Sequence, residues 1–144
     1  MKRQDIQPRD VEAIPPVLDE GILYISERYR VAMHKCCCGC GEEVVSPLNP
    51  AEWSVIRRGR LVSLFPSIGN WNFPCKSHYW IKANRIVWSG RLPAQQIQAV
   101  QAQDNRAKVE YVAELNRVDD QKFTGPGFWG RLCAWIAGWM KRIR

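Results

Sequence analysis

Four of the six cysteines in this 144-residue chain occupy five consecutive positions, as Cys36, Cys37, Cys38 and Cys40. Cysteines this close cannot pair with one another without strain, whereas a disulfide framework spreads its cysteines so that each bridge closes a loop. The chain begins without the apolar run of a signal peptide, which favours a reducing cytoplasmic location. Clustered thiols in that setting indicate metal ligands or redox chemistry, and no βαβ pattern supports the redox alternative.

A second group of ligand types follows 35 positions after Cys40, in the stretch Cys75-Lys76-Ser77-His78. Zinc prefers four Cys or His ligands in a closed structural site. Spacing leaves two sets open, which are Cys37, Cys40, Cys75 and His78, or Cys36, Cys38, Cys40 and Cys75. The alternative is a set of buried cysteines without metal. We favour a structural zinc, because adjacent cysteines cannot all face one core and a small domain needs such a staple.

Short alternating segments surround these cysteines and predict β-strands. The predicted strands are residues 22–25, 29–35, 43–46, 53–57, 61–65, 78–82 and 85–88. Gly39 and Gly41 permit tight turns between the cysteines, and Gly59 and Ala83-Asn84 each suit a hairpin turn. We therefore expect an α+β, mainly β fold: a small zinc-stapled domain of short antiparallel strands, followed by C-terminal helices.

Changes in composition divide the chain into four predicted parts. These are an irregular lead-in (1–20), a zinc-binding β domain with the active site (21–91), a polar helix or linker (92–124) and an amphipathic Trp-rich helix (125–144). Residues 128–144 carry three of the seven tryptophans and four positive charges. Such a helix suits a membrane surface, at the inner face of the membrane, and the alternatives are packing on its own domain or in a partner's groove.

The formal net charge of +7 raises the question of a nucleic-acid partner. Four of these charges belong to residues 128–144, and the remaining basic residues are interspersed with acids. We therefore do not expect nucleic acid as the main partner, and a zinc-ribbon nucleic-acid module is the lesser alternative.

Three segments together resemble the BubE-like family of bacterial ubiquitin-like conjugation operons. They are residues 34–42 (HKCCCGCGE), 62–71 (VSLFPSIGNW) and 75–81 (CKSHYWI). The resemblance implies a peptidase or isopeptidase, similar to deubiquitinases, that processes or removes a ubiquitin-like modifier. Its partners would be that modifier and its conjugates. The family has proline where this chain has Cys37, so the resemblance favours Cys36, Cys38, Cys40 and Cys75 as ligands and leaves Cys37 as a decoy or substitute.

A peptidase without a catalytic metal needs a nucleophile, a base and an orienting group. We expect Ser67 as nucleophile, His78 as base, Glu42 as the group that orients the imidazole, and Asn70 as a donor to the oxyanion. Ser77 is a poorer nucleophile, because neighbours on a strand point to opposite faces.

Each residue also has an alternative role. His78 could bind zinc, Ser67 and Asn70 could shape the loop, Glu42 could be a solvated carboxylate, and His34 could be the base or a ligand. Three ligands and a water would make a zinc-dependent peptidase instead. A non-catalytic zinc-binding interaction module of the same pathway is the rival function.

Overall fold

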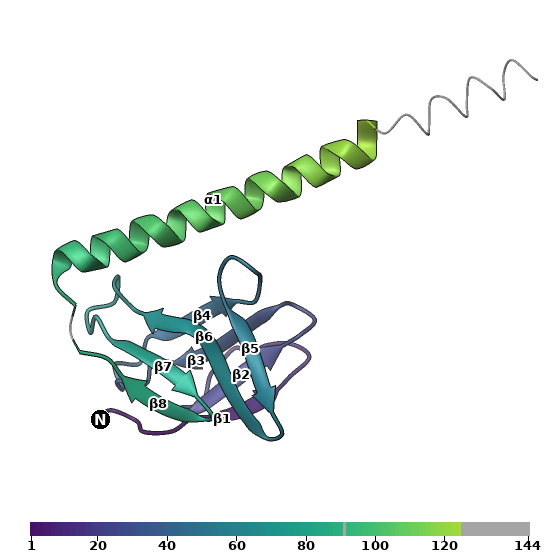
Figure 1. Ribbon diagram of the computed structural model, residues 1–144. Coiled ribbons are helices and arrows are strands. Elements are labelled where there is room, and N and C mark those ends of the chain that lie inside the picture. Colours follow the sequence, from purple (N-terminus) through teal and green to yellow (C-terminus); the bar gives the residue numbers. More distant parts are fainter. Residues whose placement is uncertain (91, 125–144) are drawn as a thin grey trace, which may run out of the picture. The chain divides into compact units, whose positions relative to one another are not determined.

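The computed structural model describes residues 1–90 and 92–124, which contain eight strands and one helix (Figure 1). Residues Met1–Lys108 form one compact unit, which holds every strand, and a second unit begins at Val109. The helix, α1, spans Ala94–Thr124 and so begins directly after Pro93. No helix among the described residues is both long enough and apolar enough to cross a membrane.

The first sheet contains four strands in sequence order. They are β1 (Gln7–Asp10), β2 (Ile22–Ser26), β3 (Val31–Lys35) and β4 (Glu43–Pro47). Strands β2, β3 and β4 pair antiparallel, whereas β1 pairs parallel with β2. The turn between β3 and β4 carries the four neighbouring cysteines.

The second sheet also has four strands in sequence order, all antiparallel. They are β5 (Ser54–Arg58), β6 (Leu61–Gly69), β7 (His78–Lys82) and β8 (Arg85–Trp88). The hairpin turns fall where the sequence predicted them, with positive φ at Gly59, Ala83 and Asn84. The pairing of β6 with β7 changes register between Leu64 and Ile68, and this irregularity contains Ser67.

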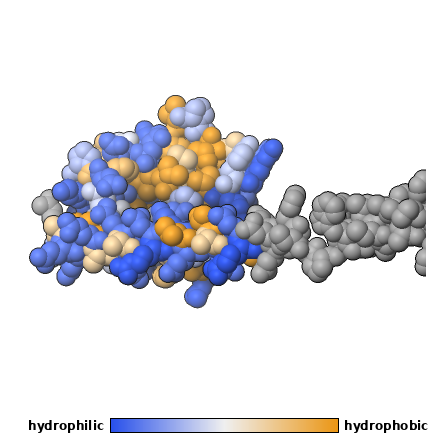
Figure 2. Space-filling view, turned by 90° about the horizontal axis from the view of Figure 1, so that it is seen from above, coloured by the Kyte–Doolittle hydropathy of each residue, from blue (hydrophilic) through white to orange (hydrophobic). Residues whose placement is uncertain are grey.

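The two sheets face each other and bury one core between them, as in a β-sandwich. The first sheet supplies Leu23, Ile25, Ala32 and Val44 to this core, and the second supplies Val62, Leu64, Ile68, Tyr79, Ile81 and Ile86. The side chains of His34 and Tyr79 join the layers, with Nε2 and the hydroxyl 2.8 Å apart. Residues between these buried positions point outward. Some of them are apolar, and Figure 2 shows apolar patches on the surface beside hydrophilic ones.

The predicted mainly β fold of short strands is confirmed, and two details differ from it. The segment predicted as an irregular lead-in forms β1, and Ile6 just before it is buried in the core. The strand β1 is parallel to its neighbour, because the chain crosses over between Asp10 and Ile22 instead of turning back in a hairpin. The amphipathic helix predicted for 125–144, including Cys133, lies outside the described residues.

Candidate active site and cysteine cluster

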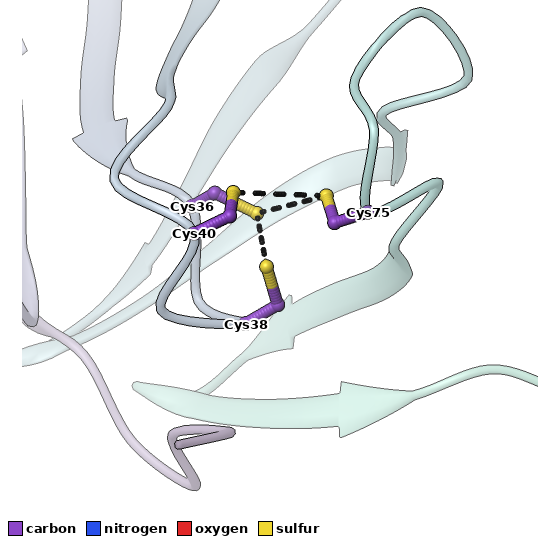
Figure 3. A group of neighbouring side chains, drawn as sticks. All are labelled: Cys36, Cys38, Cys40 and Cys75. Carbon is purple, nitrogen blue, oxygen red and sulfur yellow. Dashed lines mark hydrogen bonds between the residues drawn. The ribbon is translucent and has the colours of Figure 1, made fainter.

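Four cysteine side chains converge at one end of the sandwich (Figure 3). Their sulfur atoms all lie within 4.8 Å of one another and belong to Cys36, Cys38, Cys40 and Cys75. The Sγ atom of Cys36 lies 3.4 Å from that of Cys38 and 3.9 Å from that of Cys75. The turn after β3 and the loop before β7 thus meet at one point, and this connects the two sheets.

The turn that carries three of these cysteines depends on its glycines. Gly39 and Gly41 have φ values of 83° and 87°, which a residue with a side chain adopts at a cost. The Cys36 carbonyl accepts a hydrogen bond from the Gly39 amide at 3.0 Å, and the Cys36 amide donates to the Glu42 carbonyl at 2.8 Å. These bonds curl the chain so that alternate residues present their sulfur atoms to the same side.

The donor set fits a zinc ion. Zinc–sulfur bonds of about 2.3 Å in a tetrahedron place the sulfurs about 3.8 Å apart, which is close to the separations of 3.4, 3.7 and 3.9 Å within the cluster. Burial raises the pKa of the Cys38 and Cys40 thiols. Burial acts in the same direction on Cys75, but hydrogen bonds with Ser77, Cys38 and Cys40 together outweigh it and bring the pKa of that thiol down to about 7. A bound dication would favour the thiolate form of all four.

Two polar side chains support the cluster, one from the residue after β6 and one from the residue before β7. The amide nitrogen of Asn70 donates to Cys36 Sγ at 3.4 Å and to Ser77 Oγ at 2.9 Å. The Ser77 hydroxyl lies 3.2 Å from Cys36 Sγ and 3.5 Å from Cys75 Sγ. Both residues are buried. Such outer contacts orient the ligands of a metal site and tune its affinity.

Cys37 and His34 lie outside this cluster. The Cys37 side chain is fully buried in the core, and burial raises the pKa of its thiol to about 12. The ring of His34 is also fully buried, and burial lowers its pKa to about 4. The alternative ligand set with Cys37 and His78 is therefore not assembled, because Cys37 faces the core and His78 contacts Ser67 instead.

Ser67 and His78 meet on the outer face of the second sheet, with Oγ and Nε2 3.1 Å apart. Gly69 pairs with His78 across β6 and β7, so Ser67 is the diagonal neighbour of His78 on the same face. His78 is partly buried, and this burial lowers the pKa of its imidazole below the usual 6.5. A neutral imidazole beside a serine hydroxyl is the arrangement that activates a nucleophile.

A comparison with known protein families matches residues 10–89 to the family described as bacterial ubiquitination-like system serine protease (BubE). The chain belongs to the BubE family. The match covers the whole second sheet and all of the first sheet except residues 7–9 of β1. Parallel comparisons with curated proteins and with solved structures give no match.

As a member of the BubE family, this chain belongs to a family of serine proteases, and aromatic side chains surround its Ser67–His78 pair. Two indoles flank the imidazole, with the Trp71 ring centroid 5.0 Å away and the Trp80 centroid 5.1 Å away. Trp71 lies over the position where a side chain on Gly69 would be, since a Cβ there would meet the indole at 2.4 Å. Two aromatic rings thus pack against the imidazole.

The other two predicted site residues of this BubE-family chain do not meet the pair. The Glu42 carboxylate is exposed, and no described side chain bonds to the buried Nδ1 atom of His78. The Asn70 side-chain amide donates one hydrogen bond to Cys36 of the cysteine cluster and one to the Ser77 hydroxyl, and its backbone amide donates to the Ser77 carbonyl at 2.9 Å. The structure therefore brings Ser67 and His78 together and places Asn70 beside the thiols.

Sequence reasoning missed three residues that shape the site, namely Trp71, Trp80 and Ser77 as a support of the cluster. Ser67 and His78 themselves line a hollow whose other walls include Glu52, Trp53, Trp71 and, from α1, Asp104. The available signal was the pairing of a small residue with an aromatic one, because Gly69 two positions before Trp71 leaves room for the indole. The nearness of Trp71 and Trp80 to His78 in the sequence was a signal that their rings could contact the imidazole.

Proposed function

We propose that this protein is a serine peptidase that cleaves at the C-terminus of a ubiquitin-like protein, with Ser67 as nucleophile and His78 as general base. The observation that carries the proposal is the 3.1 Å contact between Ser67 Oγ and His78 Nε2 in a chain of a serine-protease family. The family description also implies a ubiquitin-like partner. Precursor processing and removal of the modifier from conjugates both break an amide bond after its C-terminal residue.

The proposed reaction has two halves. The Ser67 hydroxyl passes its proton to Nε2 of His78 as Oγ bonds to the substrate carbonyl carbon. The imidazolium then returns the proton to the leaving amine, and the carbon–nitrogen bond breaks. In the second half, water gives a proton to His78 and attacks the acyl carbon, and the bond to Ser67 breaks as Oγ takes that proton back from His78. This sequence requires a neutral imidazole at the start, which the lowered pKa of His78 supplies.

We further propose that Cys36, Cys38, Cys40 and Cys75 hold a structural zinc. The bound ion would supply a cross-link between the β3–β4 turn and the loop before β7, and this loop leads directly into His78. Four protein ligands leave no open position for water, so the zinc-dependent peptidase is the weaker alternative. Asn70 belongs to this support rather than to the oxyanion site, since its side-chain amide donates to Cys36 and to the Ser77 hydroxyl.

The nucleophile is tested with Ser67→Ala and a matched control, Ser54→Ala. Ser54 is an exposed serine on β5, and its hydroxyl makes only a long 3.5 Å hydrogen bond to the Phe65 carbonyl. We expect Ser67→Ala to abolish cleavage of the ubiquitin-like precursor and to abolish labelling by a fluorophosphonate, whereas Ser54→Ala keeps both. Full cleavage by Ser67→Ala would overturn the proposed nucleophile and favour the non-catalytic interaction module.

The zinc is tested by metal analysis of the purified protein. We expect stoichiometric zinc in the wild type and in Cys37→Ser, and loss of zinc in Cys40→Ser. Cys37→Ser is the matched control, because its sulfur lies in the core and not in the cluster. Zinc that is absent from the wild type, or retained by Cys40→Ser, would contradict the proposed ligand set.

A further inference from the structure

The outer face of the second sheet carries large apolar side chains, and the described residues leave most of them exposed. We call it the outer face and define it by Ile56, Leu61, Phe65, Trp80 and Val87. Ile56 is 49% exposed, Phe65 63% and Val87 42%. Single exposed apolar side chains are common on folded domains, whereas a contiguous patch of them marks an interaction surface.

The strand register places these residues side by side. Trp80 pairs with Val87 across β7 and β8, and Ile56 pairs with Ser63 across β5 and β6. Leu64 pairs with Ile81 and Ile68 with Tyr79, so Trp80 on β7 lies opposite the irregular stretch of β6 that contains Phe65. The alternation of buried and exposed residues along each strand puts all of them on the side away from the core.

The outer face is continuous with the catalytic pair. Phe65 lies two positions before Ser67 on β6, and Trp80 lies two positions after His78 on β7. The Trp80 indole also contacts the His78 imidazole at a centroid distance of 5.1 Å. A partner seated on this face therefore meets Ser67 and His78 at one end of its footprint.

The other end of the outer face is cationic. Three exposed cations lie at strand ends there: β5 ends at Arg58, β7 ends at Lys82 and β8 begins at Arg85. The Lys82 ammonium lies over the Trp80 ring, 5.3 Å from its centroid. The outward positions of β5 to β8 carry no acid, and Asp5, which bridges to Arg85 at the sheet edge, is the nearest one in register. None of the ion pairs in the described part of the chain uses these three cations.

We infer that the outer face docks the folded body of the ubiquitin-like substrate, through an apolar patch on that body bordered by acidic side chains. This inference rests on the proposed function. Four strands about 4.8 Å apart make a face roughly 15 Å wide, far broader than one extended peptide needs. From Lys82 to His78 the strand covers about 13 Å, so a domain bound over the cations and apolar residues presents its C-terminal tail at Ser67.

The test compares two substrates of the full-length chain, the folded ubiquitin-like precursor and a peptide of its C-terminal tail alone. The variant is the double change Ile56→Thr and Val87→Thr, which keeps β-branched side chains and removes apolar surface. The control is Val45→Thr on β4, an exposed valine (50%) of the other sheet. We expect the double variant to raise KM for the folded precursor about tenfold, with unchanged kcat and unchanged cleavage of the peptide. The control should match the wild type on both substrates.

A KM that rises equally for both substrates, or for neither, would overturn the docking surface. Binding is measured separately by calorimetry with the folded modifier, so that a chain without peptidase activity still gives an answer. A weaker Kd in the double variant supports the surface, and an equal Kd, or no binding by the wild type, overturns it. Two other results would assign the face to another occupant and would also overturn the inference. One is a dimeric wild type with a monomeric double variant, and the other is a cross-link from the outer face to residues 125–144.

The cations give a second measurement on the same proposal. Replacing Arg58 and Arg85 by glutamate should slow association with the folded modifier at low salt, since charges at the rim of an interface act mainly on the association rate. The difference from the wild type should shrink as salt is added. An association rate that stays unchanged at low salt would contradict the acidic border assigned to the partner.

Discussion

The side-chain amide of Asn70 donates a hydrogen bond to the sulfur of Cys36 over 3.4 Å. Asn70 directly follows β6, the strand that carries Ser67, and Cys36 directly follows β3 in the other sheet. Ser77 repeats this link from the residue before His78. The two residues next to the strands of Ser67 and His78 are therefore bonded to the cysteine cluster, so that the cluster and the Ser67–His78 pair share one support.

Asn70→Ala should weaken zinc binding and leave the ligand set intact. Contacts of this kind around a metal site typically account for a 10- to 100-fold change in affinity, so we expect a fall of about that size. Competition with a chromogenic zinc chelator measures it. Asn49→Ala is the control, because its amide bonds to Glu52 and is remote from the thiols. Equal affinities of the two variants would show that Asn70 does not support the cluster.

Gly69→Ala should impair catalysis by displacing Trp71. The new Cβ would lie 2.4 Å from the indole nitrogen, so the ring must move away from His78. A displacement of about 1 Å in a catalytic group can cost up to 100-fold, and we expect kcat/KM to fall at least tenfold. Gly90→Ala is the matched control, since nothing lies within 4 Å of its Cβ position. Steady-state kinetics on the ubiquitin-like precursor would contradict this role for Gly69 if both variants kept wild-type activity.

Much of the fold follows from local patterns in the sequence. The alternation in 29–35 and 78–82 predicted strands, and these contain β3 and β7. The strand β1 was missed because Gln-Pro-Arg-Asp shows no alternation, and its pairing is parallel and with a distant segment. Such pairing depends on how the chain folds back, and a local pattern does not record it.

The candidate site was predictable to a similar degree. The cysteines chosen from the family resemblance are the four that converge, and Ser67 and His78 lie in contact. Glu42 follows the cysteines in sequence, yet its carboxylate points to solvent, because the turn at Gly41 directs the chain away. The change of register in β6 decides which residue faces His78, and only the paired strands show it.

Stability should fall in mild acid because His34 is buried as a neutral ring. Its pKa is about 4 in the folded chain against 6.5 for an exposed histidine, so the unfolded chain binds a proton first as the pH falls. The stabilisation is present in full above pH 6.5 and is lost as the pH falls from 6.5 towards 4. At about pH 5 the loss should be about 2 kcal/mol. Urea unfolding of wild type and His34→Gln measures it, and an equal pH dependence in both would contradict this assignment.

The pH dependence of catalysis should follow His78 and be independent of Glu42. Burial lowers the pKa of His78, and the base acts when it is neutral, so the acid limb of kcat/KM should have its midpoint below 6.5. Glu42 has an exposed carboxylate with no bond to the ring, so Glu42→Gln should keep both the rate and this midpoint. Initial rates of precursor cleavage between about pH 5 and pH 8 measure both. A loss of rate near that of a triad aspartate, about 10⁴-fold, or a lower midpoint in Glu42→Gln would instead make Glu42 the group that orients His78.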